Sequence, residues 1–371
     1  MMTNDKGVTL SLNYFEENYD KVQFARKTEE CNGLRNAQIG ASHAIASFFT
    51  LKPNSTAIVV MPTGSGKTAV LNVTPFLVCA RKVLVITPSK MVRSQIFEEF
   101  SELNTLINTN VLPALIHKPN VLEMEHRYLE DEKKKYDNFD VVVATPQCAL
   151  SLVEDREEAE KFDCILIDEA HHTPAASWTK IIDLTDKAKH VLFTATPFRI
   201  DYQEIKGEMV YRYPLNLAYQ DGIFGEILYI PIEESDNKDL KIAIKAEEVF
   251  NEDRAKGLEH YLMVRTATKD KAKELETLYK ENTNLRLQRI DSSMTNSTVK
   301  SCIKLLRERK LDGIICVDML GEGFDFPNLK IAAIHEVHKS LANTLQFIGR
   351  FARTNASNIG TAKFIAINDE E

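Results

Sequence analysis

The sequence predicts an α/β protein of two domains, each a mostly parallel sheet flanked by helices. Short apolar runs rich in β-branched residues, such as 57–60 and 141–144, alternate with longer segments whose apolar residues recur at helical spacing. Runs of this length without polar alternation are typical of buried parallel strands. Each run ends in polar, proline-containing or acidic residues, and open α/β sheets bind their ligands at that end of the strands. The 371 residues suffice for two full cores.

A glycine-containing loop follows the first strand. The strand 57–60 leads into Met61-Pro62-Thr63-Gly64-Ser65-Gly66-Lys67-Thr68, after which the pattern becomes helical. Strand, loop and Lys-Thr at a helix start are the context of a phosphate-binding loop, although the strict pattern has glycine in place of Met61. The glycines allow backbone N–H groups to point inward and hold phosphate oxygens. We therefore predict that this loop binds a nucleoside triphosphate, with Lys67 at the phosphates and Thr68 at Mg²⁺.

The first domain is predicted to span 31–225, after an N-terminal extension, 1–30. A helical face before the phosphate loop breaks at Lys52-Pro53. Residues 121–135 are predicted to form an exposed helix, because 130–135 is a block of both charges. The single tryptophan, Trp178, is predicted to pack in the core. Further strands are predicted at 82–86, 140–144, 162–167 and 190–193.

The second domain is predicted to span 226–371. The turn signal Asp221-Gly222 and a shift in composition precede it. Its predicted strands are 261–264, 313–317, 331–334 and 361–367, and its predicted helices are 271–279 and 299–306. A last helix, with Ser340 as its N-cap, is predicted to carry Gln346, Gly349, Arg350 and Arg353.

An acidic pair follows the fourth strand of the first domain. Asp168 and Glu169 come directly after the apolar run 162–167. One carboxylate can bind Mg²⁺, and the adjacent one can polarise a water for in-line attack on the γ-phosphate. An isolated Asp-Glu pair is common on solvated surfaces. Its place at a strand end, downstream of Lys67 and Thr68, favours the catalytic interpretation.

Two arginines of the second domain suit a phosphate. Arg350 and Arg353 are three residues apart, so on a helix both side chains project from one face. The guanidinium group is planar, permanently charged and forked, as a γ-phosphate contact requires. The alternative is an exposed helix with ordinary arginines. If the catalytic interpretation holds, hydrolysis requires residues of both domains.

Composition excludes some classes of function. The net charge of −8 argues against a protein that coats nucleic acid by bulk attraction, but it leaves room for a local groove of N–H groups and hydroxyls. No apolar run reaches the length of a membrane span, and the start lacks a signal-peptide pattern. The six cysteines include no Cys-x-x-Cys pair. We therefore expect no membrane partner and a cytoplasmic location.

The motifs in their order resemble a superfamily 2 helicase or translocase of the DEAD/DEAH class. In order they are Gln38, Thr63–Thr68, Thr87-Pro88-Ser89, Thr145-Pro146-Gln147, Asp168-Glu169-Ala170-His171, Thr194-Ala195-Thr196, Gly323-Phe324-Asp325 and Gln346-x-x-Gly349-Arg350-x-x-Arg353. Within the class the chain is most similar to the helicase subunits of type I and III restriction systems. That finer resemblance rests on Ala218-Tyr219-Gln220-Asp221-Gly222 and Glu322-Gly323-Phe324-Asp325-Phe326-Pro327.

The resemblance implies two tandem RecA-like domains, with ATP and Mg²⁺ between them and nucleic acid across both. Gln38 is implied to recognise adenine and Asp325 the ribose. The implied catalytic residues are Lys67, Asp168, Glu169, Gln346, Arg350 and Arg353. The implied ATP contacts are Arg35, Gln38, Pro62, Thr63, Gly64, Ser65, Gly66, Lys67, Thr68 and Asp325, with Thr68 and Asp168 at Mg²⁺. The implied contacts to the nucleic-acid backbone are Thr87, Pro88, Thr145, Thr194, Thr196 and Gly321, so that binding is largely independent of sequence.

The function expected from these motifs is an ATP-dependent helicase or translocase that moves on or unwinds nucleic acid, with DNA favoured over RNA. By analogy it is the motor of a restriction or anti-phage defence system, with a nuclease or specificity partner. The chain is either a minimal motor or the core of a longer protein. The alternatives are a translocase that leaves strands paired, an ATP-switched clamp or sensor, and an RNA helicase. A small-molecule kinase is disfavoured, because it has no use for Arg350 and Arg353.

Overall fold

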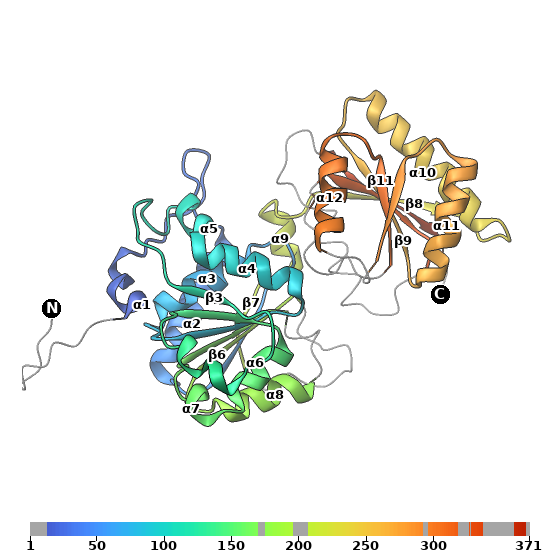
Figure 1. Ribbon diagram of the computed structural model, residues 1–371. Coiled ribbons are helices and arrows are strands. Elements are labelled where there is room, and N and C mark those ends of the chain that lie inside the picture. The colour runs from blue at the N-terminus through green and yellow to red at the C-terminus, as the bar shows by residue number, and fades with distance from the viewer. Residues whose placement is uncertain are drawn as a thin grey trace, which may run out of the picture. The chain divides into compact units, whose positions relative to one another are not determined.

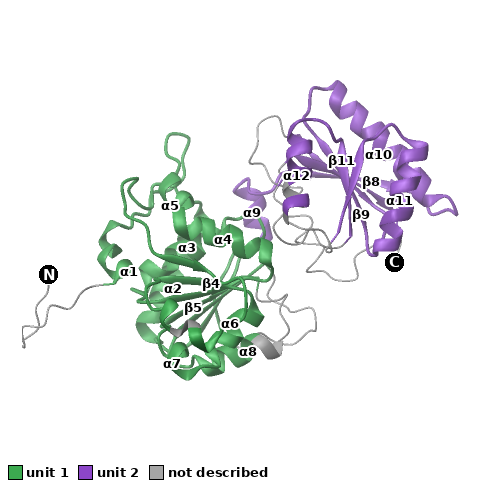
Figure 2. Ribbon diagram, viewed as in Figure 1, with its two compact units in different colours: residues 1–214 green, residues 215–371 purple. Residues whose placement is uncertain are grey.

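The computed structural model describes residues 13–169, 175–195, 207–291, 296–317, 326, 328–336 and 360–368. The chain divides into two compact units, Met1–Pro214 and Leu215–Glu371 (Figure 2). Each unit is a parallel sheet flanked by helices, which confirms the predicted fold class. The predicted domain limits, 30/31 and 225/226, remain predictions.

The first unit is built on seven strands that pair in the order β3-β4-β2-β5-β6-β1-β7, all of them parallel. In chain order the strands are β1 (Thr56–Val60), β2 (Val83–Ile86), β3 (Val121–Glu123), β4 (Val141–Ala144), β5 (Cys164–Ile167), β6 (Lys189–Thr194) and β7 (Glu208–Arg212). The four-residue strands β2, β4 and β5 are buried along their whole length, as expected for strands covered on both faces.

Helices cover both faces of this sheet. They are α1 (Tyr14–Glu17), α2 (Asn36–Leu51), α3 (Lys67–Leu77), α4 (Lys90–Glu102), α5 (Asn104–Asn108), α6 (Pro146–Val153), α7 (Arg156–Ala159) and α8 (Ala175–Leu184). In Figure 1, α3, α4 and α5 lie on one side of the sheet and α6, α7 and α8 on the other. Trp178 of α8 is 1% exposed and packs with α6 and the sheet in one apolar cluster, so the prediction of core packing is confirmed.

The prediction of a helix over 121–135 is wrong. Residues 121–123 form β3, which pairs with β4 at the edge of the sheet, and only Glu130–Lys135 is helical, as a short 3-10 helix. The charged block correctly indicated exposure. It gave no sign of the three residues ahead of it, because their conformation is set by backbone pairing with Val141, Val142 and Val143 rather than by local preference.

The second unit is built on six parallel strands in the order β10-β11-β9-β12-β13-β8. They are β8 (Ile227–Ile232), β9 (Tyr261–Thr266), β10 (Leu287–Ile290), β11 (Gly313–Val317), β12 (Leu329–Ile334) and β13 (Ala362–Ile367). The helices are α9 (Leu215–Gln220), α10 (Lys238–Ala255), α11 (Lys269–Asn282) and α12 (Asn296–Arg307). Apolar residues of α10 and α11 pack on one face of the sheet, and α12 lies on the other side (Figure 1).

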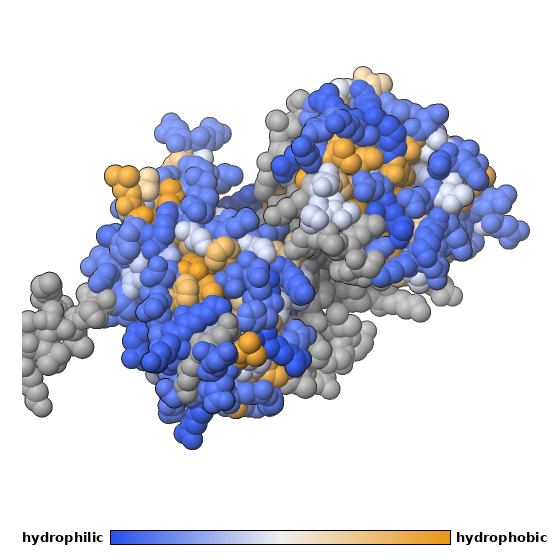
Figure 3. All heavy atoms as spheres, in the orientation of Figure 1, coloured by the Kyte–Doolittle hydropathy of each residue, from blue (hydrophilic) through white to orange (hydrophobic). Residues whose placement is uncertain are grey.

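The surface of the described residues is largely hydrophilic in the view of Figure 3, as the 27% of charged residues suggests. Among these residues, no helix combines the length and the apolar character that a bilayer crossing requires.

Candidate functional site

Five neighbouring strands of the first unit bring the sequence motifs to one edge of the sheet. These are β4, β2, β5, β6 and β1, and all five run in the same direction. Backbone hydrogen bonds align the residues at the strand ends: Thr87 N donates to Ala144 O at 3.0 Å, Asp168 N to Ile86 O at 2.9 Å, and Met61 N to Thr194 O at 2.9 Å. Parallel pairing therefore joins motifs that are far apart in the sequence.

The phosphate-binding loop has the backbone that its sequence predicts. Gly64 and Gly66 have φ of 85° and 92°, a region in which a β-carbon is strained. Gly66 is the N-cap of α3, and a glycine has no side chain to bind the N–H groups of the first helical turn. Such N–H groups are a ready site for phosphate oxygens. Within the loop, the buried Ser65 Oγ donates to Pro62 O at 2.6 Å, which fixes the turn.

Arg35 and Gln38, at the start of α2, form hydrogen bonds to carbonyl oxygens of the phosphate-binding loop. Arg35 Nη1 donates to Gly64 O at 2.8 Å, and Gln38 Nε2 donates to Gly66 O at 3.2 Å. The Gln38 amide oxygen accepts from Arg35 N at 2.8 Å. The structure thus gives Gln38 a support role that sequence reasoning missed, and its role at adenine stays a prediction. The side chain is 6% exposed, so the loop and Gln38 position one another.

Lys67 and Glu169 form an ion pair. Lys67 Nζ contacts Glu169 Oε1, and the two side chains are only 11% and 16% exposed. Glu169 has a φ of 50°, uncommon for a residue with a side chain, and its N–H donates to Asp168 Oδ1 at 3.0 Å. A backbone held in a sparsely populated region at a candidate site indicates that the placement of this carboxylate matters. The pair joins the loop after β1 to the end of β5, across β6.

The threonines predicted to contact nucleic acid line the same edge but are buried. Thr87 and Thr194 have no exposed surface, and Thr145 has 9%. The Thr87 hydroxyl lies 3.4 Å from both Ser89 O and Ala144 O, so it points toward main-chain oxygens of the protein itself. Ser89 caps α4 through Val92 N, as predicted from its place before the helix. Contacts of these residues with nucleic acid stay predictions.

Several predicted site residues lie outside the described residues. They are Thr196, Gly321, Asp325, Gln346, Arg350 and Arg353, together with Ala170 and His171 of the acidic motif. The structure brings together the other predicted ATP-site residues, because Arg35 and Gln38 contact the phosphate-binding loop and its Lys67 contacts Glu169.

Two protein-family models match the sequence. Residues 32–199 match the model described as "Type III restriction enzyme, res subunit", and residues 245–355 match "Helicase conserved C-terminal domain". The first match contains the phosphate-binding loop and Asp168-Glu169. The second contains the positions of Gln346, Arg350 and Arg353.

Known proteins similar to this chain include relatives bound to either nucleic acid. A probable ATP-dependent RNA helicase of Dictyostelium discoideum, ddx52, is 22% identical over 79% of this chain and 44% of its own length. The structure of S. cerevisiae Dbp5 bound to RNA and ADP BeF3 has a TM-score of 0.61 at 16% identity, over 93% of this chain and 90% of that one. The ATP-dependent Type ISP restriction-modification enzyme LlaBIII, bound to DNA, has a TM-score of 0.63 at 17% identity, over 94% of this chain and 29% of that one.

The chain thus spans less than half the length of the ddx52 relative and under a third of LlaBIII. Both solved structures share its fold at low identity. At these identities the solved structures show the fold alone. The two family models carry the likeness of sequence: the first contains the phosphate-binding loop and the acidic pair, and the second contains the positions of the paired arginines. Over both units the chain thus resembles the superfamily 2 helicases.

Proposed function

We propose that this chain is a nucleic-acid-stimulated ATPase that moves on or unwinds DNA. The observation that carries the proposal is the loop after β1, with two glycines at positive φ and a lysine paired with the glutamate after β5. A loop of this kind holds phosphates, and a carboxylate beside it can act on water. The match of residues 245–355 to the helicase C-terminal model supports the link to nucleic acid.

The residues present suit ATP with Mg²⁺. The Thr68 hydroxyl and the Asp168 carboxylate are hard oxygen donors of the kind that Mg²⁺ prefers, and we propose that they hold it. When bound, the ion neutralises charge on the phosphates. Both residues are half-buried rather than fully buried.

The contacts of Lys67 suggest how the site works. Phosphate oxygens compete with Glu169 for the Lys67 ammonium group, and a Glu169 carboxylate released from that ion pair can orient and polarise the attacking water. Gln346, Arg350 and Arg353 are proposed to stabilise the charge that develops on the γ-phosphate. Hydrolysis then depends on residues of both units, which allows it to be coupled to movement.

DNA is the favoured track because the longer of the two family matches is to a restriction-enzyme subunit and LlaBIII was solved with DNA. On the same ground we propose a role in restriction or defence, with a nuclease or specificity partner. An RNA helicase is the second candidate, favoured by the ddx52 relative and by Dbp5 bound to RNA. A cytoplasmic location remains a prediction.

ATP hydrolysis measured with single-stranded DNA, duplex DNA and RNA tests the proposal. Stimulation by DNA that is lost in both Lys67→Ala and Glu169→Gln is the expected result, and stimulation by RNA alone would favour the second candidate. Lys52→Ala is the matched control, since Lys52 pairs with Glu208 on the surface, away from the loop. Hydrolysis that none of the nucleic acids stimulates, or that survives both substitutions, would contradict the proposal.

A further inference from the structure

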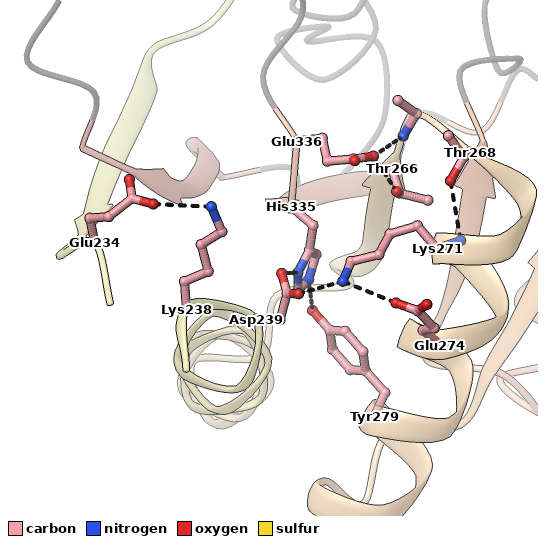
Figure 4. Close-up of polar contacts among 11 residues, drawn as sticks. Glu234, Lys238, Asp239, Thr266, Thr268, Lys271, Glu274, Tyr279, His335 and Glu336 are labelled. Carbon is pink, nitrogen blue, oxygen red and sulfur yellow. Dashed lines mark hydrogen bonds and ion pairs between the residues drawn. The ribbon is translucent and has the colours of Figure 1, made fainter. Parts of the chain in front are cut away.

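In the second unit, two polar anchors flank the positions 337–359, which include Gln346, Arg350 and Arg353. The first anchor holds His335 and Glu336, which follow directly on β12, and the second holds Gly360, just ahead of β13. The contacts of both anchors are made by described residues, and Figure 4 draws the first of them.

At the first anchor, the His335 imidazole connects two helices to the end of β12. Its Nδ1 lies 2.7 Å from Asp239 Oδ1 on α10, and its Nε2 lies 3.0 Å from the Tyr279 hydroxyl on α11. Lys271 of α11 pairs with the second oxygen of Asp239 at 2.8 Å (Figure 4). The hydrogen bond from His335 lowers the pKa of Asp239, so this carboxylate is charged at neutral pH. The His335 side chain is fully buried.

The Glu336 side chain is bound by residues at the end of the neighbouring strand, β9. Its Oε2 accepts from Thr266 Oγ1, at the end of β9, and from Ala267 N, directly after it, each at 2.6 Å (Figure 4). Its backbone carbonyl accepts from Arg265 Nη1 at 2.9 Å. The hydrogen bond from Thr266 lowers the pKa of Glu336, so these are charge-assisted contacts at neutral pH. The chain therefore leaves β12 at a position and direction fixed by α10, α11 and the end of β9.

At the second anchor, Gly360 N donates to His260 Nε2 at 3.2 Å. His260 Nε2 is therefore an acceptor, and the ring proton lies on Nδ1, which is 2.7 Å from Asp253 Oδ2. Burial lowers the pKa of His260, in keeping with the neutral ring that this pattern requires. His260 and Asp253 are fully buried, and Lys363 Nζ pairs with the other oxygen of Asp253.

Both anchors use a carboxylate of the same helix. Asp239 and Asp253 lie at opposite ends of α10 (Lys238–Ala255), fourteen residues or about four turns apart, so they project from nearly the same face. A single rigid element thus fixes where the chain leaves the sheet before position 337 and where it returns at position 360. Buried pairs of this kind cost free energy to desolvate, which makes them poor devices for stability alone and better ones for specifying position.

We propose that α10 is a brace for the segment 337–359, and that Asp239, His335, Asp253 and His260 are positioning residues for ATP hydrolysis. The inference rests on the proposed function, in which Gln346, Arg350 and Arg353 act on the nucleotide. Losses of about a hundredfold in rate are known when a catalytic group is misplaced by about an ångström, so the positions of the two ends of this segment are expected to affect kcat. The four residues touch neither nucleotide nor nucleic acid in this scheme.

The test measures kcat and KM for ATP with the full chain and its stimulating nucleic acid. His335→Ala and His260→Ala, one for each anchor, are expected to lower kcat at least about tenfold and to change KM by less than about threefold. His335→Asn keeps a donor near the position of Nδ1 and is expected to recover most of the loss. If His335→Ala fails to fold, as judged by circular dichroism, kcat and KM are measured instead in His335→Asn and Tyr279→Phe. Tyr279→Phe is expected to lower kcat at unchanged KM.

Two controls distinguish a positioning role of the anchor residues from a purely structural one. Asp312→Ala removes a carboxylate of similar burial in the same unit, which binds Arg286 and, on α10, Arg254. It therefore disturbs a contact of the same helix without touching either anchor. It is expected to lower thermal stability as much as His260→Ala but to leave kcat unchanged. In the Arg353→Ala background, the anchor substitutions are expected to reduce kcat by a smaller factor than in the wild type, because one of the groups that they position is already absent.

Losses of equal size in the wild-type and Arg353→Ala backgrounds, or wild-type kcat in folded His335→Ala and His260→Ala, would overturn the brace. An equal loss in Asp312→Ala would also overturn it, since the effect would then follow stability alone. Failure of the proposed function looks different. Wild-type turnover in Arg353→Ala itself removes the catalytic role of the segment, and the brace with it.

Discussion

The two units hold their functional edges in different ways. In the first unit, the motifs follow directly on central strands, and backbone hydrogen bonds between parallel neighbours align them. In the second unit, His335 N also donates to the neighbouring strand, to Arg265 O at 3.1 Å, but side chains add to this pairing. Side chains of α10, α11 and the end of β9 hold His335 and Glu336, and His260, ahead of β9, holds Gly360. The edge of the first unit is aligned by sheet pairing, and the second unit adds buried polar pairs after β12 and ahead of β13.

This difference affects how each edge tolerates change. A backbone ladder survives most side-chain substitutions, because every residue supplies the same N–H and C=O groups. A buried polar network depends on each member, and the loss of one leaves its partner unsatisfied at a cost of about 1–3 kcal/mol, or more for a charged group. We therefore expect single substitutions to affect positioning more in the second unit, and binding of phosphate more in the first.

The largest expected effect separates these two roles. Arg353→Ala is expected to reduce kcat by about 10³–10⁵-fold while ATP still binds, because the phosphates are held by the loop of the first unit. Nucleotide binding followed by fluorescence, together with steady-state hydrolysis, provides the measurement. Arg309→Ala, which removes an exposed arginine paired with Glu259 in the same unit, is the control. Weak ATP binding in Arg353→Ala would show that the division of roles is incorrect.

A smaller effect tests whether the units are stabilised independently. Trp178→Ala leaves a cavity in the core of the first unit and is expected to cost about 3–5 kcal/mol there. Hydrogen exchange of the full chain should then quicken in β1, β5 and β6 and remain unchanged in β9, β11 and β12. Trp178→Phe, a smaller truncation, should show a weaker form of the same pattern. Equal acceleration in both units would mean that they unfold as one.

The smallest of the three effects concerns acid stability of the first unit. Burial lowers the pKa of His190 on β6 to about 4, and its Nε2 lies 2.9 Å from Thr185 Oγ1. In an unfolded chain this residue binds a proton near pH 6.5, so the stability due to its neutral form is present above pH 6.5. It is lost as the pH falls toward 4, by about 3 kcal/mol.

Urea unfolding followed by the fluorescence of Trp178 reports on the first unit alone, because the chain has one tryptophan. The difference in unfolding free energy between wild type and His190→Gln should shrink as the pH falls from 6.5 to 4. A difference that stays constant over this range would contradict the assignment to His190.

The central strands and the phosphate-binding loop could be predicted from the sequence. β1, β2, β4, β5 and β6 in the first unit, and β9, β11, β12 and β13 in the second, are apolar runs that stand out because both of their faces are covered. The loop could be predicted because Gly64, Gly66, Lys67 and Thr68 are contiguous, and local geometry depends on contiguous residues. Asp168 and Glu169 followed from their place after a strand.

The four edge strands, β3, β7, β8 and β10, were decided only by tertiary structure. Each is partly exposed and pairs with one neighbour only, and that pairing sets its conformation. β3, β7 and β10 carry charged residues, and β8 is apolar but contains Pro231, which is unfavourable inside a strand. The anchors of the second unit were decided in the same way. Asp239 and His335 are 96 residues apart, and no spacing in the sequence relates them. Contacts between distant residues depend on how helices pack on a sheet, and a local pattern contains no information about that packing.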